Sequence, residues 1–280
     1  MRSVNFDRRK EEKELLAIVI LSIVSKIPSF APYVTFQGGN ALRFCYGGHR
    51  FSDDLDFVSK KIMFNPDEIV NTLKKGIAKL FSNRVEVKYR HREDSIMHTF
   101  DVSVYPDKKD VKKIDVELEI AEGIPAFTRV VSSTKSKYDS LSVLINVEEK
   151  REILADKIIA MGNRPLREKT PFKARDVWDI FWLMEMQIPI DTDLVKNKIL
   201  SYKISYDSFL KVIKFRVENL DSDNSVKYFQ EEMSRYIDED IQMLMDEQAT
   251  RDMLSRTKEW ISSFLKVMDS SFSEGTETAR

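Results

Sequence analysis

Residues 38–57 of this chain read Gly-Gly-Asn-Ala-Leu-Arg-Phe-Cys-Tyr-Gly-Gly-His-Arg-Phe-Ser-Asp-Asp-Leu-Asp-Phe, and this stretch determines the expected fold. An apolar run directly before it predicts a buried strand over 33–36 that ends at the paired glycines. Residues 40–46 are expected to form a short helix or turn. The next strand contains Asp54 and Asp56, whose spacing of two places both carboxylates on one strand face.

These carboxylates and glycines together suit a site for a metal ion and a nucleotide. Asp54 and Asp56 would repel each other on one face unless a cation lay between them, and Mg²⁺ is commonly held by one or two carboxylates plus substrate phosphates. Gly38 and Gly39 allow the backbone to approach a ligand closely, and a helix starting there would present N–H groups to phosphate. Asp53 alternates to the other face and is expected in solvent or a turn. The alternative interpretation is a polar turn entering a strand.

A third carboxylate is expected on a neighbouring strand. Residues 114–120 alternate apolar and acidic, which places Asp115, Glu117 and Glu119 on one face. Three acids on one face repel each other unless they are solvated or bound to a cation. Glu117 or Glu119 is therefore expected to complete the metal site, and a solvent-exposed strand face is the alternative.

Two blocks of sequence, which cover about half the chain, resemble a known family. The first block contains Gly38-Gly39-Asn40-Ala41-Leu42-Arg43 and His49-Arg50-Phe51-Ser52-Asp53-Asp54-Leu55-Asp56-Phe57. The second contains Glu152, Lys157 and Arg175-Asp176-Val177-Trp178-Asp179. In this order they are similar to the AbiEii/AbiGii nucleotidyltransferases, which are toxins of bacterial abortive-infection toxin–antitoxin systems within the polymerase-β-like superfamily.

The resemblance implies an Mg²⁺-dependent enzyme that uses an NTP as substrate. The paired glycines and Asn40 would cradle phosphate, with Asn40 standing where the family usually has Thr or Ser. Arg43 would lie one helical turn beyond the glycines, where it would pair with phosphate or with Asp54. Ser52 would contact phosphate or fix the turn before the strand.

The downstream block would supply catalytic and nucleotide-binding side chains from helices. Lys157 lies beside an apolar stripe, where a lysine is usually a surface residue whose stem packs on the protein. The resemblance instead favours triphosphate binding. Asp176 and Asp179 share a helix face, and would hold Lys157, bind metal-bound water or position the acceptor hydroxyl. A basic cluster between the two helices would contact RNA or triphosphate, or would be solvated; its members are Arg164, Arg167, Lys169, Lys173 and Arg175.

Composition excludes several other classes of protein. The formal net charge of −1 argues against a chain that coats nucleic acid nonspecifically. Cys45 is the only cysteine, so no intrachain disulfide forms, which fits a cytoplasmic protein. The longest apolar run, at 15–24, is too short for a membrane-spanning helix, and no membrane partner is expected. The chain contains no Gly-x-x-x-x-Gly-Lys-Ser/Thr phosphate loop, so a P-loop NTPase is not expected.

The hydrophobic patterning predicts an α+β protein with two domains and a tail. Residues 1–146 are expected to form a nucleotidyltransferase-type mixed β-sheet with flanking helices. Residues 147–268 should form an all-helical C-terminal domain, in which the last helix spans 240–268. The Ser/Thr/Gly-rich residues 269–280 are expected to be a disordered tail.

The expected function is transfer of an NMP group from an NTP to an acceptor. By analogy with related toxins the acceptor is RNA, such as the 3′ end of tRNA, and the family also implies a cognate antitoxin. One alternative is a nucleotidyltransferase that modifies a small molecule such as an antibiotic, which would need an acidic acceptor pocket for a cationic drug. The other is a non-catalytic nucleotide- or RNA-binding module, which the paired carboxylates argue against.

Overall fold

The computed structural model describes residues 2–61, 64–81, 84–93, 95–105, 111–121, 129–133, 143–166 and 171–277. Of residues 2–8, 129–133 and 270–277 it describes the secondary structure but not the side chains. The chain forms two compact units, Met1–Glu149 and Lys150–Arg280. Among the helices described, none combines the length and apolar character needed to cross a membrane.

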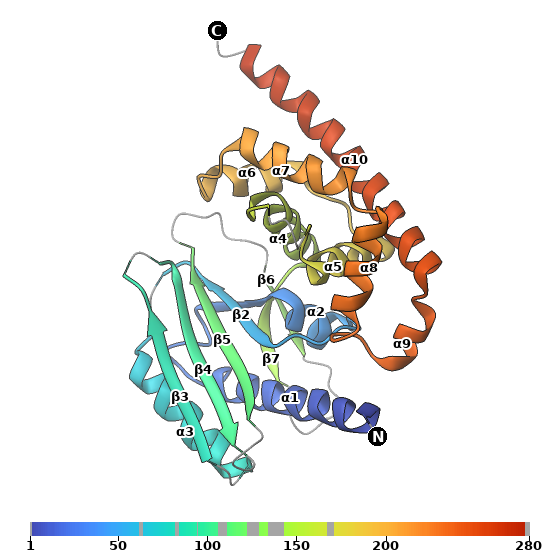
Figure 1. The fold of residues 1–280 in the computed structure, drawn as a ribbon. Helices are drawn as coiled ribbons and strands as arrows, with labels where there is room; N and C mark the ends of the chain where they lie inside the picture. Colours follow the sequence, from blue (N-terminus) through green and yellow to red (C-terminus); the bar gives the residue numbers. More distant parts are fainter. Residues whose placement is uncertain are drawn as a thin grey trace. The chain divides into compact units, whose positions relative to one another are not determined.

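The first unit is built on a mixed β-sheet (Figure 1). In the part of the chain that the structure describes, seven strands pair in the order β3-β4-β5-β2-β1-β7-β6. Their bounds are β1 (Val34–Gln37), β2 (Asp54–Ser59), β3 (Arg84–His91), β4 (Met97–Tyr105), β5 (Lys112–Ile120), β6 (Arg129–Ser133) and β7 (Leu144–Glu148). The pairs β2–β5 and β1–β7 are parallel, and the other pairs are antiparallel. The mixed sheet predicted from sequence is confirmed, whereas β6 was not predicted.

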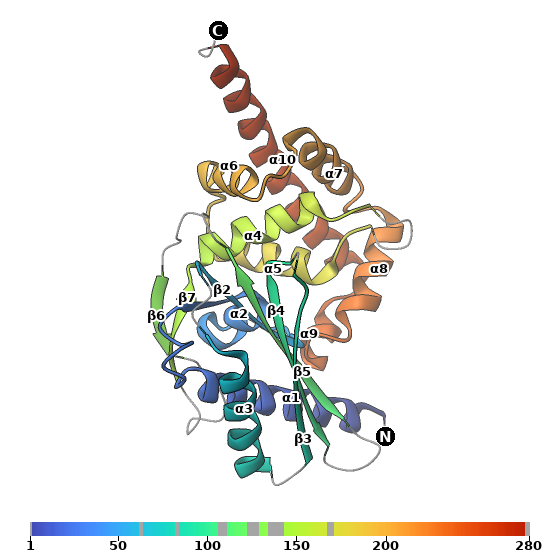
Figure 2. The ribbon, with the colours of Figure 1, turned by 90° about the vertical axis from the view of Figure 1, so that its left-hand side faces the viewer.

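Helices cover one face of this sheet. Figures 1 and 2 show α1 (Arg2–Val24) and α3 (Pro66–Phe81) on that face, where they pack against β5, β3 and each other. The third helix of the unit, α2 (Gly38–Tyr46), follows β1 without a linker and packs against β1, β2 and β7. Alternation along β2 and β5 places Leu55, Phe57, Val116 and Leu118 in the core. The acidic residues of the same strands consequently lie on the opposite face.

The second unit is all-helical in its described residues. Its helices are α4 (Lys150–Asn163), α5 (Ala174–Glu185), α6 (Thr192–Ser201), α7 (Tyr206–Glu218), α8 (Asp223–Met233), α9 (Glu239–Leu244) and α10 (Glu247–Glu277). Helix α4 packs against α5, α6 and α7. The close approach of α7 depends on Gly162, because a Cβ atom there would lie 2.2 Å from the Phe209 ring. The helix that carries Lys157 is therefore in contact with three other helices of this unit, α5, α6 and α7.

The last helices of this unit differ from those expected. Residues 240–268, predicted as one helix, form the end of α9 and then α10, with a break at Met245 and Asp246. The side-chain oxygen of Asp246 accepts a hydrogen bond from the Ala249 amide at 2.8 Å, which starts α10 in the manner of an N-cap. Helix α10 then continues to Glu277, into the segment for which the sequence predicted disorder.

Candidate active site

The turn from β1 into α2 brings the backbone against a carboxylate of β2. Gly38 has φ of +76°, and a Cβ atom at this position would lie 2.3 Å from Oδ2 of Asp56. Only glycine accepts both the left-handed backbone and this proximity without strain. A Cβ atom on Gly39 would lie 2.2 Å from the Arg50 guanidinium. The paired glycines thus allow α2 to begin directly beside Asp56 and the buried Arg50.

Strand register determines which acids are neighbours on the polar face of the sheet. Asp56 pairs with Gln37 of β1 on one side and with Glu117 of β5 on the other. Asp54 pairs with Asp115, whereas Glu119 pairs with Val58. Because adjacent strands lie about 4.8 Å apart and alternate residues about 7 Å apart, Glu117 is the β5 acid closest in register to Asp56. The register favours Glu117 over Glu119, the choice that sequence left open.

The acids further along this face form ion pairs with basic residues. Asp101 of β4 receives two hydrogen bonds of 2.6 Å from the Arg90 guanidinium, and Nζ of Lys113 lies 3.1 Å from Asp115. The hydrogen bond from Arg90, against an opposing effect of burial, lowers the pKa of Asp101. Asp115 therefore belongs to a salt-bridged group shared with β3 and β4.

Asn40 and Ser52 connect the glycine turn to the start of β2. The buried Asn40 amide nitrogen donates to the backbone oxygen of Asp54 at 2.7 Å and to that of Ser52 at 3.3 Å. These bonds fix the start of β2, the strand that carries the metal-ligand candidates Asp54 and Asp56. The Asn40 side chain thus has a positioning role in the structure, which it exerts through the backbone of Ser52 and Asp54. Phosphate binding by Asn40 or Ser52 stays a prediction.

Arg43 does not contact Asp54, which was one of its two expected partners. Its guanidinium pairs with the Glu14 carboxylate of α1 at 3.0 Å and stacks on the Phe51 ring with a centroid distance of 3.9 Å. Asp53 also pairs with a residue of α1, with 2.8 Å between its Oδ1 and Nζ of Lys13. Sequence reasoning missed the pairing with Glu14 because it joins residues far apart in the chain.

In the second unit, Lys157 lies between two carboxylates. Its Nζ is 3.2 Å from Asp176 and 3.1 Å from Asp179, so α4 and α5 are joined by a nearly buried ion cluster. Of the roles that sequence left open for the two acids, holding Lys157 is the one present in this structure. Arg164, which follows α4, also bonds to Asp176. Burial acts to raise the pKa of Asp176, but Lys157 and Arg164 outweigh it and lower that pKa to about 2.

Protonation of Asp176 is expected to destabilise the protein at low pH. The folded pKa lies below the unfolded value, so the stabilisation is present above about pH 4 and is lost as the pH falls towards 2. We expect a loss of about 2 kcal/mol in the free energy of unfolding over this window. Urea denaturation of wild type and Asp176→Asn at pH 5 and pH 2.5 measures it. A pH dependence of equal size in the variant would contradict this assignment.

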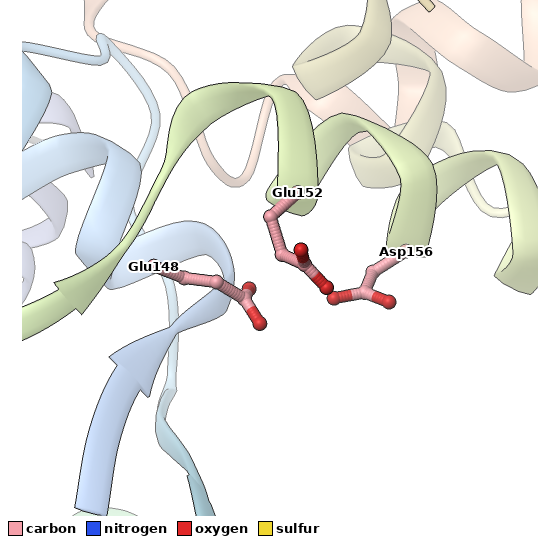
Figure 3. Close-up of side chains that lie close together, drawn as sticks. All are labelled: Glu148, Glu152 and Asp156. Atoms are coloured by element: carbon pink, nitrogen blue, oxygen red, sulfur yellow. The ribbon is translucent and has the colours of Figure 1, made fainter. Parts of the chain in front are cut away.

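Helix α4 also carries an acidic pair that a buried lysine neutralises. Figure 3 shows Glu152 and Asp156 projecting from the same side of α4, in a view that includes Glu148 at the end of β7. Both α4 carboxylates bond to Nζ of Lys198, which is 1% exposed. Burial raises the pKa of Glu152 to about 7 against the opposing attraction of Lys198. The spacing of the two acids was visible in the sequence, but nothing there indicated Lys198 of α6 as their partner.

The basic cluster predicted between the two motif helices is described only in part. Arg167 and Lys169 lie outside the described residues. Burial lowers the pKa of Lys173, with an opposing effect from Asp176. The Arg175 guanidinium lies 4.6 Å from the centre of the Tyr236 ring. Of the described members of this basic cluster, Arg164 is therefore the one that bonds directly to Asp176.

Comparison with known proteins confirms the resemblance seen in the sequence. The sequence model of the family described as "Nucleotidyl transferase AbiEii toxin, Type IV TA system" matches residues 20–262, which is most of the chain. None of the curated proteins matches this chain.

Solved structures share the fold at low sequence identity. A proposed nucleotidyltransferase of Helicobacter pylori aligns with a TM-score of 0.56 and 18% identity over 96% of this chain and 98% of its own. JHP933, also from Helicobacter pylori, aligns at 0.50 and 19% over 95% and 97%. MenT4, a nucleotidyltransferase toxin of Mycobacterium tuberculosis, aligns at 0.51 and 17% over 93% of each chain. With the family match over most of its length, this chain belongs to the AbiEii family of nucleotidyltransferase toxins.

Proposed function

We propose that this enzyme transfers an NMP group from an NTP to the 3′ end of an RNA, such as a tRNA, in a reaction that depends on Mg²⁺. The observation that carries the proposal is the position of Asp56, which lies against the Gly38 turn and pairs in register with Glu117. Oxygen donors of this kind are the ligands that Mg²⁺ prefers. Membership of a toxin–antitoxin family implies a nucleotide substrate and a cognate antitoxin as partner.

Asp54, Asp56 and Glu117 would hold the metal. Magnesium bound there would neutralise charge on the attacking and leaving oxygens. The backbone at Gly38 and Gly39, which begins α2, would direct N–H groups at the phosphates. Lys157 would supply a compact positive charge to the triphosphate, with Asp176 and Asp179 fixing its ammonium group.

The proposed reaction is a displacement at the α-phosphorus. The acceptor hydroxyl oxygen forms a bond to this phosphorus, and the bond from phosphorus to the bridging oxygen of the β-phosphate breaks. Pyrophosphate leaves with that electron pair, and the hydroxyl proton passes to one of the strand carboxylates. The protein contributes mainly through positioning and electrostatic stabilisation, as in other phosphoryl transfers.

Mutation can show whether Glu117 or Glu119 is the third metal ligand. Glu117→Gln is expected to lower the transfer rate on the order of tenfold, because glutamine keeps only a neutral oxygen as ligand. Glu119→Gln, matched in chemistry and placed beside Val58, should change the rate by less than about twofold. Single-turnover rates at saturating Mg²⁺ make the comparison. A larger effect from Glu119 than from Glu117 would assign the third ligand to Glu119.

The acceptor is tested with labelled nucleotides and two preparations of the same RNA. Purified protein is incubated with Mg²⁺, each α-labelled NTP in turn, and either intact tRNA or tRNA whose 3′-terminal diol has been oxidised with periodate. We expect label in intact tRNA and none in oxidised tRNA. Label that enters neither, but appears in a small molecule when cell extract is added, would overturn the RNA proposal in favour of small-molecule modification.

A further inference from the structure

A buried arginine of α7 binds the backbone on both sides of the connection between α4 and α5. The Arg216 side chain donates to the carbonyl oxygens of Pro165 and Pro171, each at 2.9 Å, and to that of Met161. The residue is 4% exposed. Met161 and Pro165 lie before residues 167–170, which are outside the described residues, and Pro171 lies directly after them. One side chain therefore determines how far apart the two ends of this connection lie.

The segment held in this way carries Arg164, which bonds to Asp176. Arg164 lies between two of the residues whose carbonyl oxygens Arg216 binds, and its side chain remains 42% exposed. Asp176 also pairs with Lys157, so the two cations are gathered on one carboxylate. Lys157, Arg164 and Arg216 together carry more positive charge than Asp176 and Asp179 offset. A cluster with a net positive charge and an accessible guanidinium suits an anion with several charges.

We propose that Arg216 is a positioning residue, which holds Arg164 beside Lys157 so that the pair binds the triphosphate of the NTP. The inference rests on the proposed function in assigning a triphosphate to Lys157. It adds Arg164 as a second residue that binds the triphosphate and Arg216 as the residue that positions Arg164. Arginine suits the position because its planar fork reaches several acceptors at once. A lysine has a single ammonium group and cannot reproduce the three bonds along those directions.

The cost of burying Arg216 indicates that the arrangement is specific. Burial and the nearby charge of Arg164 lower the pKa of Arg216, and Asp176 opposes them. Its bonds go to neutral carbonyl oxygens, so within the described part of the chain no carboxylate in contact with it offsets the repulsion from Arg164. A purely apolar contact would join α7 to α4 without this repulsion, as Phe209 and Gly162 already do.

The test is a double-mutant cycle read by binding of inorganic tripolyphosphate to the full-length protein. We expect Arg164→Gln and Arg216→Gln each to weaken binding by about tenfold, and the double variant to be no weaker than either alone. Arg216→Lys should behave as Arg216→Gln does. In the transfer assay Arg216→Gln should raise KM for NTP and leave kcat within about twofold.

Two control variants separate this role from stability and net charge. Ile213→Val alters a buried residue of the same helix, and Arg235→Gln removes an exposed positive charge from the same unit. Both should bind tripolyphosphate as wild type does. Additive effects of Arg164→Gln and Arg216→Gln, or a wild type that does not bind tripolyphosphate, would overturn the inference. Absence of nucleotide transfer by a wild type that binds tripolyphosphate would contradict the proposed function alone.

Discussion

Asp56→Asn is expected to reduce nucleotidyl transfer by about 10³-fold or more, the largest effect of any single substitution in this enzyme. A metal-binding carboxylate supports several kcal/mol of transition-state stabilisation, and each 1.36 kcal/mol corresponds to about tenfold in rate. Asp56 pairs in register with Glu117 and lies against the Gly38 turn. Asparagine is nearly isosteric, so the variant should fold, and single-turnover rates measure its loss of activity.

Asp53→Asn is the matched control for that substitution. Asp53 is three residues away, pairs with Lys13 at 2.8 Å and has a side chain that is 45% exposed. An exposed ion pair contributes about 0–1 kcal/mol to stability, so this variant should keep near wild-type activity and stability. Equal loss of activity in the two variants would show that the effect comes from net charge or the local turn rather than from a metal ligand.

Gly38→Ala is expected to lower activity by about 10²-fold, although the substitution removes no polar side chain from the site. The new Cβ atom would lie 2.3 Å from Asp56 Oδ2, so the carboxylate must move. A displacement of about 1 Å in a catalytic group costs on the order of 10²-fold in rate. The left-handed backbone adds a stability cost of about 1–2 kcal/mol, measurable by urea denaturation.

Gly47→Ala separates backbone strain from the displacement of Asp56. Gly47 ends α2 with φ of +82°, and among the described residues nothing beyond Gly47, its chain neighbours and the adjoining helix backbone lies within 4 Å of the position its Cβ would take. This variant should show the same stability cost of about 1–2 kcal/mol with activity within about twofold of wild type. If Gly38→Ala loses no more activity than Gly47→Ala, the close approach to Asp56 has no part in catalysis.

The sequence predicted the parts of the site that local patterns determine. A short apolar run before paired glycines gave the strand β1 and the turn at Gly38. The period of two in residues 54–58 and 114–120 correctly placed the acids of β2 and β5 on strand faces. The change from this period of two to a helical pattern after about residue 146 separated the sheet of the first unit from the helices of the second.

Features that depend on pairing between distant segments could not be predicted. Choosing between Glu117 and Glu119 requires the register of β5 against β2, which no local pattern specifies. The sequence does not indicate which acid pairs with Arg43. Glu14 becomes its partner only because α1 packs beside it. Lys198 and Arg216 resemble ordinary helix-surface residues until α6 and α7 pack against α4.

The most direct test of the account is a comparison of α-labelled and γ-labelled NTP in the same reaction with RNA. With Mg²⁺ and wild-type protein, the account predicts that the α-label enters RNA and the γ-label appears in pyrophosphate. Both signals should disappear with EDTA or with Asp56→Asn. Transfer of the γ-label to the acceptor, or α-label transfer that persists in Asp56→Asn, would contradict Mg²⁺-dependent nucleotidyl transfer at the strand carboxylates.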